Sequence, residues 1–219
     1  MRHLANSVIL AAISVIFTSN IFCQENTESL LKQRVTLQVS QATFLYALGT
    51  LAQRYKLPLG LEKSSGHLDD PKINIDIRER PLIEALNLLF EQEPAYKWEV
   101  NNGVLNVSPT RDRSEFLSLF LGLHIDRQCV IKETNDYEFR KCILSQPEVV
   151  LLMKSKKVEY ATFMNEPSSN SILLNDNADL SVSSLTLRDY LNSIVLNSNR
   201  NTWVVEMVGK HNDKLLLSF

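Results

Sequence analysis

Glycine, proline and cysteine are scarce in this sequence, which has 6, 7 and 3 of them among its 219 residues. So few glycines and prolines exclude a collagen-like or low-complexity chain. The charge is nearly balanced, with 23 Lys and Arg against 25 Asp and Glu. We therefore expect no nucleic-acid partner, because phosphate binding needs a concentrated basic surface. The length fits one large folded domain or two small ones.

Sequence motifs of catalysis are also missing. The chain has no Gly-x-Ser-x-Gly elbow, no P-loop and no Gly-x-Gly-x-x-Gly loop. Paired-carboxylate catalysis needs acids that converge in a cleft, whereas periodicity places four glutamates on exposed faces or in loops: Glu62, Glu79, Glu84 and Glu91. We predict no catalytic residue and no cofactor, and therefore that the chain is not an enzyme.

The histidines give no clear metal site. His67 lies close to Asp69 and Asp70, which are ligand types for zinc or a hard cation. Their short spacing within a loop favours a solvated turn, so no metal site is predicted. His124 is expected at the end of a strand and His211 in a hairpin turn.

The N-terminus carries the longest uncharged apolar run, residues 8–17, after Arg2 and His3 and before a polar stretch at 18–20. This pattern is typical of a secretory signal peptide. The run is too short for a bilayer-spanning helix, which needs about 20 apolar residues. We predict a signal peptide at 1–23 cleaved after Cys23, with a retained N-terminal anchor as the alternative. No second span is expected, and the chain is predicted to be periplasmic or secreted.

Signal removal leaves two cysteines, Cys129 and Cys142. An even pair in an oxidising compartment favours a disulfide bond. Such a bond would stabilise the fold by about 2–3 kcal/mol. The alternative is two separate buried thiols that behave as small hydrophobic side chains.

The first half alternates between strand and helix patterns after a polar lead-in at 24–33. Period-two alternation predicts strands, and apolar residues three and four apart predict helices. An Asn-Gly pair at 102–103 indicates a tight hairpin turn. The expected elements are a strand at 35–39, a helix at 43–55, a short strand at 59–61, a strand at 73–77, a helix from Pro81 and a hairpin over 96–107.

The second half follows a polar linker at 109–115, which separates a domain at 34–108 from one at 116–219. Residues 116–123 fit either a helix or a buried strand. The basic cluster of Lys154, Lys156 and Lys157 is expected in a connection between strands, with contact to anionic lipid as the functional alternative. The expected elements are strands at 129–132, 158–163 and 180–183, a helix at 135–145 capped by Thr134 and ended by Pro147, a loop at 165–177, a helix at 187–196 and a hairpin of 203–206 with 215–217.

The two halves share a register. An offset of 105 residues matches identical residues with no gap, namely Leu82 with Leu187, Leu86 with Leu191, Asn87 with Asn192 and Trp98 with Trp203. Each tryptophan opens a hairpin strand after a helix, where packing in the core is the default role. The spacing predicts an internal repeat.

Four stretches of the first half resemble the secretin and TonB short N-terminal domain, called STN. They are residues 43–48, 73–77, 81–86 and 96–100, and the similarity covers 34–108 and, more faintly, 128–219. The resemblance rests on apolar spacing, since no reactive residue defines that family. It implies a periplasmic module that contacts other proteins. No secretin pore domain or transporter barrel is recognised, so those roles are not carried over.

We therefore expect an α+β fold with two βαββαβ-type lobes, each a small sheet with two helices packed on one face. The expected function is a non-catalytic cell-envelope interaction or assembly module. Its partner would be an envelope protein or a second copy bound through edge strands. The alternative is a secreted small-ligand or metal-binding protein, or a hydrolase, with a cleft between the lobes.

Overall fold

The computed structural model describes residues 29–63, 72–130, 133–161, 171–174, 185–209, 211 and 213–219. The predicted signal peptide at 1–23, the loop with His67, Asp69 and Asp70, and the predicted strand at 180–183 lie outside these residues. No helix in the described ranges is long and apolar enough to cross a membrane. The predicted α+β class is confirmed, because helices and several sheets share the fold.

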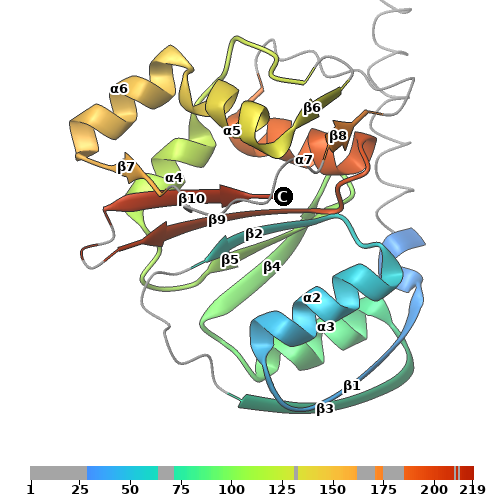
Figure 1. Cartoon of the computed structure of the whole chain (residues 1–219). Coiled ribbons are helices and arrows are strands. Elements are labelled where there is room, and N and C mark those ends of the chain that lie inside the picture. The colour runs from blue at the N-terminus through green and yellow to red at the C-terminus, as the bar shows by residue number, and fades with distance from the viewer. Residues whose placement is uncertain are drawn as a thin grey trace, which may run out of the picture.

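A six-stranded sheet runs through the centre of the molecule (Figure 1). Strand β2 is parallel to both of its neighbours, β5 and β9, and β7 is parallel to β10. The pairs β4–β5 and β9–β10 are antiparallel hairpins. In spatial order the strands are β4 (Tyr96–Asn101), β5 (Val104–Pro109), β2 (Leu59–Lys63), β9 (Thr202–Val208), β10 (Lys214–Ser218) and β7 (Glu159–Tyr160).

Two small antiparallel sheets complete the strands. One joins β1 (Arg34–Thr43) to β3 (Lys72–Pro81), and the other joins β6 (Glu133–Asn135) to β8 (Ser171–Leu173). The helices lie on both sides of the central sheet (Figure 1). They are α2 (Phe44–Tyr55), α3 (Leu82–Glu91), α4 (Glu115–Gly122), α5 (Asp136–Leu144), α6 (Pro147–Lys156) and α7 (Leu187–Asn197).

Two hydrophobic cores lie on opposite faces of the central sheet. Successive residues of a strand point to opposite faces. On β9, Val204 packs against the core that contains α2 and α3, whereas Val205 belongs to the core that contains α4 and α7. On β5, Leu105 and Val104 divide between the two cores in the same way. The sheet is therefore the shared wall between the two cores.

The strand pairings of the two halves follow the same pattern. In the first unit, β1 pairs with β3, and β2 lies parallel to the second strand of the β4–β5 hairpin. In the second unit, β6 pairs with β8, and β7 lies parallel to the second strand of the β9–β10 hairpin. Strand directions are reversed between the units and their helices occupy opposite faces. A half-turn about an axis that lies in the sheet and crosses its strands therefore relates the two patterns.

Local capping shows which helices correspond. Thr43 caps the start of α2 with its side chain, and Asn135, rather than the predicted Thr134, does the same for α5. Helices α2 and α6 both end at a lysine in the left-handed conformation, Lys56 with φ 51° and Lys157 with φ 53°. The next residue closes each end in the same way, as the Leu57 amide donates to the Ala52 carbonyl at 2.9 Å. The single helix α2 therefore corresponds to the pair α5 and α6.

The expected lobes, each a small sheet with two helices packed on one face, differ from the observed arrangement. Helices α2 and α3 are enclosed between the β1–β3 sheet and the central sheet, because both faces of these helices carry apolar residues that belong to one core. The central sheet is also continuous between the halves, since β2 pairs with β9 along five residues. The lead-in is not wholly polar, because Leu30 and Leu31 pack against the first core.

Some predicted elements need correction. Residues 116–123 are mainly helix α4, capped by Ser114. Cys129 and Val130 are not in a strand, and the strand of this region is β6 at Glu133–Asn135. Pro147 ends α5 as expected but also begins α6, because proline fits the first helical turn. The cluster Lys154, Lys156 and Lys157 therefore lies at the end of a helix, not in a connection between strands.

The contact between β2 and β9 is tight. Trp203 is fully buried and its indole Nε1 donates to the Asn192 side chain at 2.8 Å. Its ring covers Gly60 so closely that an added Cβ on Gly60 would lie 2.3 Å from a ring carbon. Only glycine fits beneath this ring, which explains a glycine within the short strand β2.

We predict that Gly60→Ala lowers the free energy of unfolding by about 1–3 kcal/mol, because the methyl group would overlap the Trp203 ring. Gly49, on the exposed side of α2 with open space around its Cα, is the matched control. Gly49→Ala should instead stabilise the protein by about 0.5–1 kcal/mol, because alanine is the better helix former. Urea denaturation measures both, and equal effects would contradict the packing described.

Candidate functional site

A buried charge cluster lies where the two units meet. Glu62 on β2 is fully buried, which corrects the expectation that it is exposed. The guanidinium of Arg113 donates to both carboxylate oxygens at 2.9 and 3.0 Å, and Arg188 of α7 donates to one of them. Arg113 lies in the segment predicted as a linker. The cluster therefore joins the first unit, the connecting segment and the second unit.

This cluster connects β2 to the connecting segment and to α7 through ion pairs. Both oxygens of Glu62 are occupied by guanidinium groups, and Arg188 is only 17% exposed. Beside it, Lys63 forms an ion pair with Glu206 at 2.8 Å, again between β2 and β9. Each oxygen of the Glu62 carboxylate thus accepts at least one hydrogen bond from an arginine. The cluster fixes how β2 and α7 sit against each other.

A second polar network holds the segment before β6. The sulfur atoms of Cys129 and Cys142 lie 2.17 Å apart, at disulfide distance, and connect this segment to α5. The Tyr190 hydroxyl of α7 accepts the Cys129 amide at 2.9 Å and the Val130 amide at 3.3 Å. Burial raises the pKa of Tyr190, while these two donors act in the opposite direction. The side chain of Gln146 donates to the Arg127 carbonyl at 2.9 Å.

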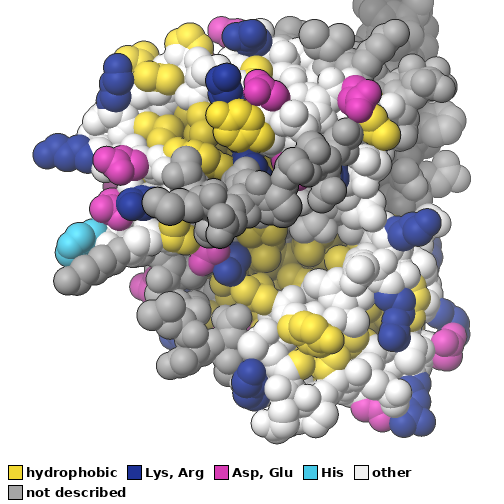
Figure 2. Space-filling view, in the orientation of Figure 1, with side chains coloured by type: hydrophobic (Ala, Val, Ile, Leu, Met, Phe, Trp, Pro, Cys, Tyr) yellow, Lys and Arg dark blue, Asp and Glu magenta, His cyan; other side chains and the backbone are white. Residues whose placement is uncertain are grey.

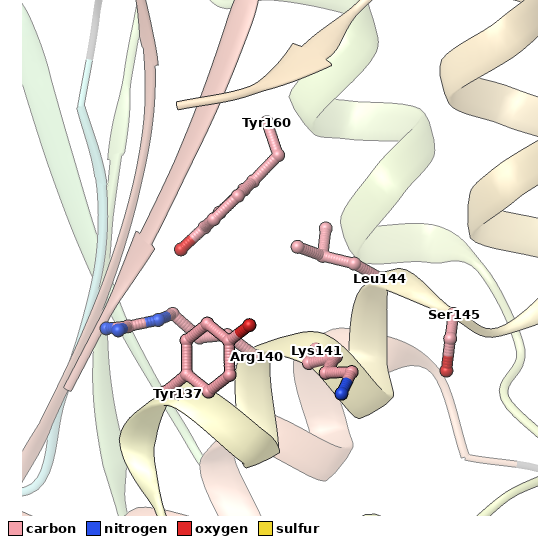
Figure 3. A pocket seen from close by; sticks show the side chains of 6 residues that line it. All are labelled: Tyr137, Arg140, Lys141, Leu144, Ser145 and Tyr160. Carbon is pink, nitrogen blue, oxygen red and sulfur yellow. The ribbon is translucent and has the colours of Figure 1, made fainter. Parts of the chain in front are cut away.

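The candidate binding site is a pocket of about 280 Å³ between α5 and β7 (Figure 3). Tyr160 projects from β7 across the pocket toward α5, and Leu144 points into the space from the helix (Figure 3). The α5 residues on its lining are Tyr137, Arg140, Lys141, Leu144 and Ser145. The pocket lies within the second unit, not in a cleft between the two units.

The pocket coincides with the point at which the two units differ most. In the first unit one 12-residue helix, α2, leads from β1 to β2. In the second unit Pro147 divides the corresponding stretch into α5 and α6, and only Val149 of α6 is buried. Helix α6 therefore does not pack along the sheet as α2 does. The space beside β7 is left to the side chains of α5, and a pocket remains there.

The chemistry around the pocket is apolar with basic residues at its margin. Tyr137 is 58% exposed, and the Lys141 amine lies 6.0 Å from the centre of its ring. The same amine lies 4.0 Å from the Glu138 carboxylate. Figure 2 shows hydrophobic side chains at the surface over α5 and α6, with charged side chains among them.

The other residues singled out in the sequence do not come together. His124 is exposed and makes an isolated bridge with Thr186, and His211 lies in the exposed β9–β10 turn. Trp203 is buried as expected, and Trp98 is half-buried. In the described part of the chain no three His, Cys, Asp or Glu residues form a group that could hold a metal ion.

Sequence reasoning missed the pocket residues and Glu62. Arg140 and Tyr160 carry no motif, and their proximity depends on how α5 packs beside β7. A signal for Glu62 did exist, because β2 is a short apolar strand and such strands are often buried on both faces. The chain matches no protein family, and searches of the curated proteins and of the solved structures found no match either.

We predict that Glu62→Gln destabilises the protein by about 3 kcal/mol, because Arg188 would keep its burial and lose its counter-charge. Glu84→Gln is the control, since Glu84 pairs with Arg80 on the exposed surface at 3.4 Å. Exposed pairs contribute little, so this variant should be close to wild type. Denaturant titrations of both variants test this, and a Glu62 variant as stable as the Glu84 variant would contradict it.

We also predict that Cys129 and Cys142 resist alkylation in denatured, unreduced protein and react fully after reduction. Replacing both by serine should lower the unfolding free energy by about 2–3 kcal/mol, since the bond closes a 13-residue separation. Mass spectrometry after alkylation counts the labelled thiols. Labelling of both without reductant would show that the pair is not bonded.

Proposed function

We propose that this chain is a non-catalytic interaction or assembly module of the cell envelope, similar in role to the STN domains that its first half resembles. The observation that carries the proposal is the way in which the two units are joined. Strand β2, at the edge of one unit, pairs in parallel with β9, at the edge of the other. Strand pairing at unit edges is therefore a contact that this architecture already uses.

Two further edges of the same kind remain at the ends of the sheet. Strands β4 and β7 are the outermost strands, and within the described residues neither has a partner on its outer side. An edge strand presents backbone donors and acceptors that a strand from another protein can pair with. Binding by strand addition needs no reactive side chain, in keeping with a module that contacts other proteins.

The pocket beside β7 supplies selectivity for such a contact. Its volume of about 280 Å³ is close to the lower end of the range of about 300–1,000 Å³ typical of sites for small organic ligands. That volume fits one or two amino-acid side chains. Backbone pairing at β7 would supply affinity, and the pocket would select the side chain that enters it.

Two observations support an exported location. The N-terminal sequence has the pattern of a signal peptide. The cysteine pair lies at disulfide distance, and structural disulfides persist mainly in oxidising compartments such as the periplasm. The proposed location is therefore the periplasm or the cell exterior.

The proposal predicts that Leu144→Asp, which places a charge in the pocket, weakens binding of an envelope partner by about tenfold or more, because the apolar contact is lost. The full chain, purified in its exported form, is used to capture partners from an envelope extract. The captured protein is then purified and its affinity measured.

Leu151→Asp is the matched control, since Leu151 lies on α6 and is 68% exposed. It should bind as wild type does. Melting curves verify that both variants fold. Equal affinities for the two variants, or no partner other than nonspecific ones, would contradict the proposed function.

A further inference from the structure

Helix α6 carries more apolar surface than the core takes up. Its residues 149–153 (Val-Val-Leu-Leu-Met) form an unbroken apolar run. Successive residues of a helix are about 100° apart, so a run of this length covers the whole circumference. Only Val149 is fully buried, and Leu151 is 68% exposed. Part of the apolar surface of α6 therefore faces away from the molecule.

The corresponding helix of the first unit is covered on its outer side. Helix α2 is enclosed between the central sheet and the β1–β3 sheet, whose strands have ten residues each. In the second unit the β6–β8 sheet has strands of three residues, and α6 packs mainly against α4 and α5. Within the described ranges, no sheet covers α6 as the β1–β3 sheet covers α2.

The outer face of α6 joins apolar side chains to basic ones. Residues three and four positions apart in a helix lie on one face, and four such residues are Pro147, Val150, Leu151 and Lys154. Lys157, which ends the helix, follows three residues after Lys154. Val150 is half-buried, and the other residues of this set are exposed. The exposed face is therefore apolar over its first two turns and basic at its end.

The two lysines beside this face form no ion pair with a described residue, and both Lys154 and Lys157 are exposed. The third lysine of the cluster is directed elsewhere. The Lys156 amine donates to the Glu115 carboxylate of α4 at 2.8 Å, and this hydrogen bond lowers the pKa of Glu115. Two positive charges thus remain at the end of the apolar face.

Acidic side chains around the face are fewer than basic ones. Glu148 is half-buried in the first turn of α6, and Glu159 is exposed on β7. Figure 2 shows hydrophobic side chains over α6, with basic side chains beside them. An exposed apolar patch with lysines at its margin is complementary to a surface that is negative at its boundary and apolar beneath. An anionic lipid bilayer has these properties.

We infer that the outer face of α6 docks on an anionic membrane surface. Val150 and Leu151 would enter the boundary between headgroups and acyl chains, while Lys154 and Lys157 reach the lipid phosphates. The helix has ten residues and is about 15 Å long, so it lies along the surface and does not cross the bilayer. The contact is separate from the pocket, which α5 and β7 line, and does not depend on the protein partner proposed there.

Co-sedimentation of the full chain, purified in its exported form, with lipid vesicles tests this inference. The probe vesicles contain equal parts of phosphatidylcholine and phosphatidylglycerol, and vesicles of phosphatidylcholine alone are the reference. We expect binding to the anionic vesicles to be about tenfold tighter or more, because each lysine near the surface adds to the attraction. Added salt should weaken this binding, since it screens exposed charges.

A charge reversal at the end of the helix is the first variant. Lys157→Glu should weaken binding to the anionic vesicles by about tenfold or more, because repulsion replaces attraction. Lys56→Glu is the matched control. Lys56 is exposed and ends α2 in the same left-handed conformation, but α2 lies on the other face of the central sheet. This control should bind the vesicles as wild type does.

A charge within the apolar face is the second variant. Leu151→Asp should weaken vesicle binding by about tenfold or more, because the inserted side chain is lost and a negative charge is added. Tyr46→Asp is its control, since Tyr46 is 64% exposed on α2 and the change adds the same charge. Vesicle binding by this control should match wild type. Melting curves verify that all four variants fold.

The possible outcomes separate this inference from the proposed function. Equal affinity for the two kinds of vesicle overturns membrane docking, and so does an equal loss in a variant and its control. A Leu151→Asp variant that binds vesicles normally but no longer captures an envelope protein also overturns it, and assigns the face to a protein. Capture of a partner that is sensitive to Leu144→Asp but not to Leu151→Asp leaves the proposed function standing whichever result the vesicles give.

Discussion

The parallel pairing of β2 with β9 is the contact on which the rest of the structure depends. This pairing joins two three-stranded halves into one six-stranded sheet. Each of the two hydrophobic cores packs against one face of that sheet. Trp203 covers Gly60 at this junction, and Glu62 holds an arginine from the connecting segment and another from α7. Apolar packing and buried charge thus act at the same strand. Without the pairing of β2 with β9, the two units would not make the contacts with each other that the structure shows.

The same junction explains where function is placed. Pairing of unit edges uses β2 and β9 and leaves β4 and β7 as the outer strands. The two units share one pattern of strand pairing, so the places where their elements differ can be located. The clearest difference is the division of one helix into α5 and α6 at Pro147, and the pocket lies at that place. Binding is accordingly proposed at the edge where the pattern has changed.

Local patterns in the sequence predicted much of the fold. Alternation identified β1 and β3, the Asn-Gly pair identified the β4–β5 turn, and the 105-residue offset aligned α3 with α7 and Trp98 with Trp203. These features depend on neighbouring residues or on composition. Helix α6 is not evident from the sequence pattern, because a proline that ends one helix is also favoured at the start of the next. The strand near Cys129 was misplaced because its apolar pattern is only a few residues long.

The features that sequence could not predict are those made by distant residues. The burial of Glu62 depends on strands on both sides of β2 and on Arg188, which is 126 residues away. The pocket forms only because Tyr160 lies opposite α5. No local sequence pattern predicts that β7 and α5 lie close together. The sequence also could not predict the face of the sheet on which each pair of helices packs. The alternation of apolar and polar residues along the strands is the same for either face. Tertiary pairing decided each of these points.

Amide hydrogen exchange, resolved by residue, tests the central junction most directly. The account predicts that the amides of Leu59, Leu61 and Trp203 exchange only through global unfolding, with the same opening free energy as the core amides of both units. If these amides open at a much lower free energy than either core, the shared sheet is not what holds the two units together.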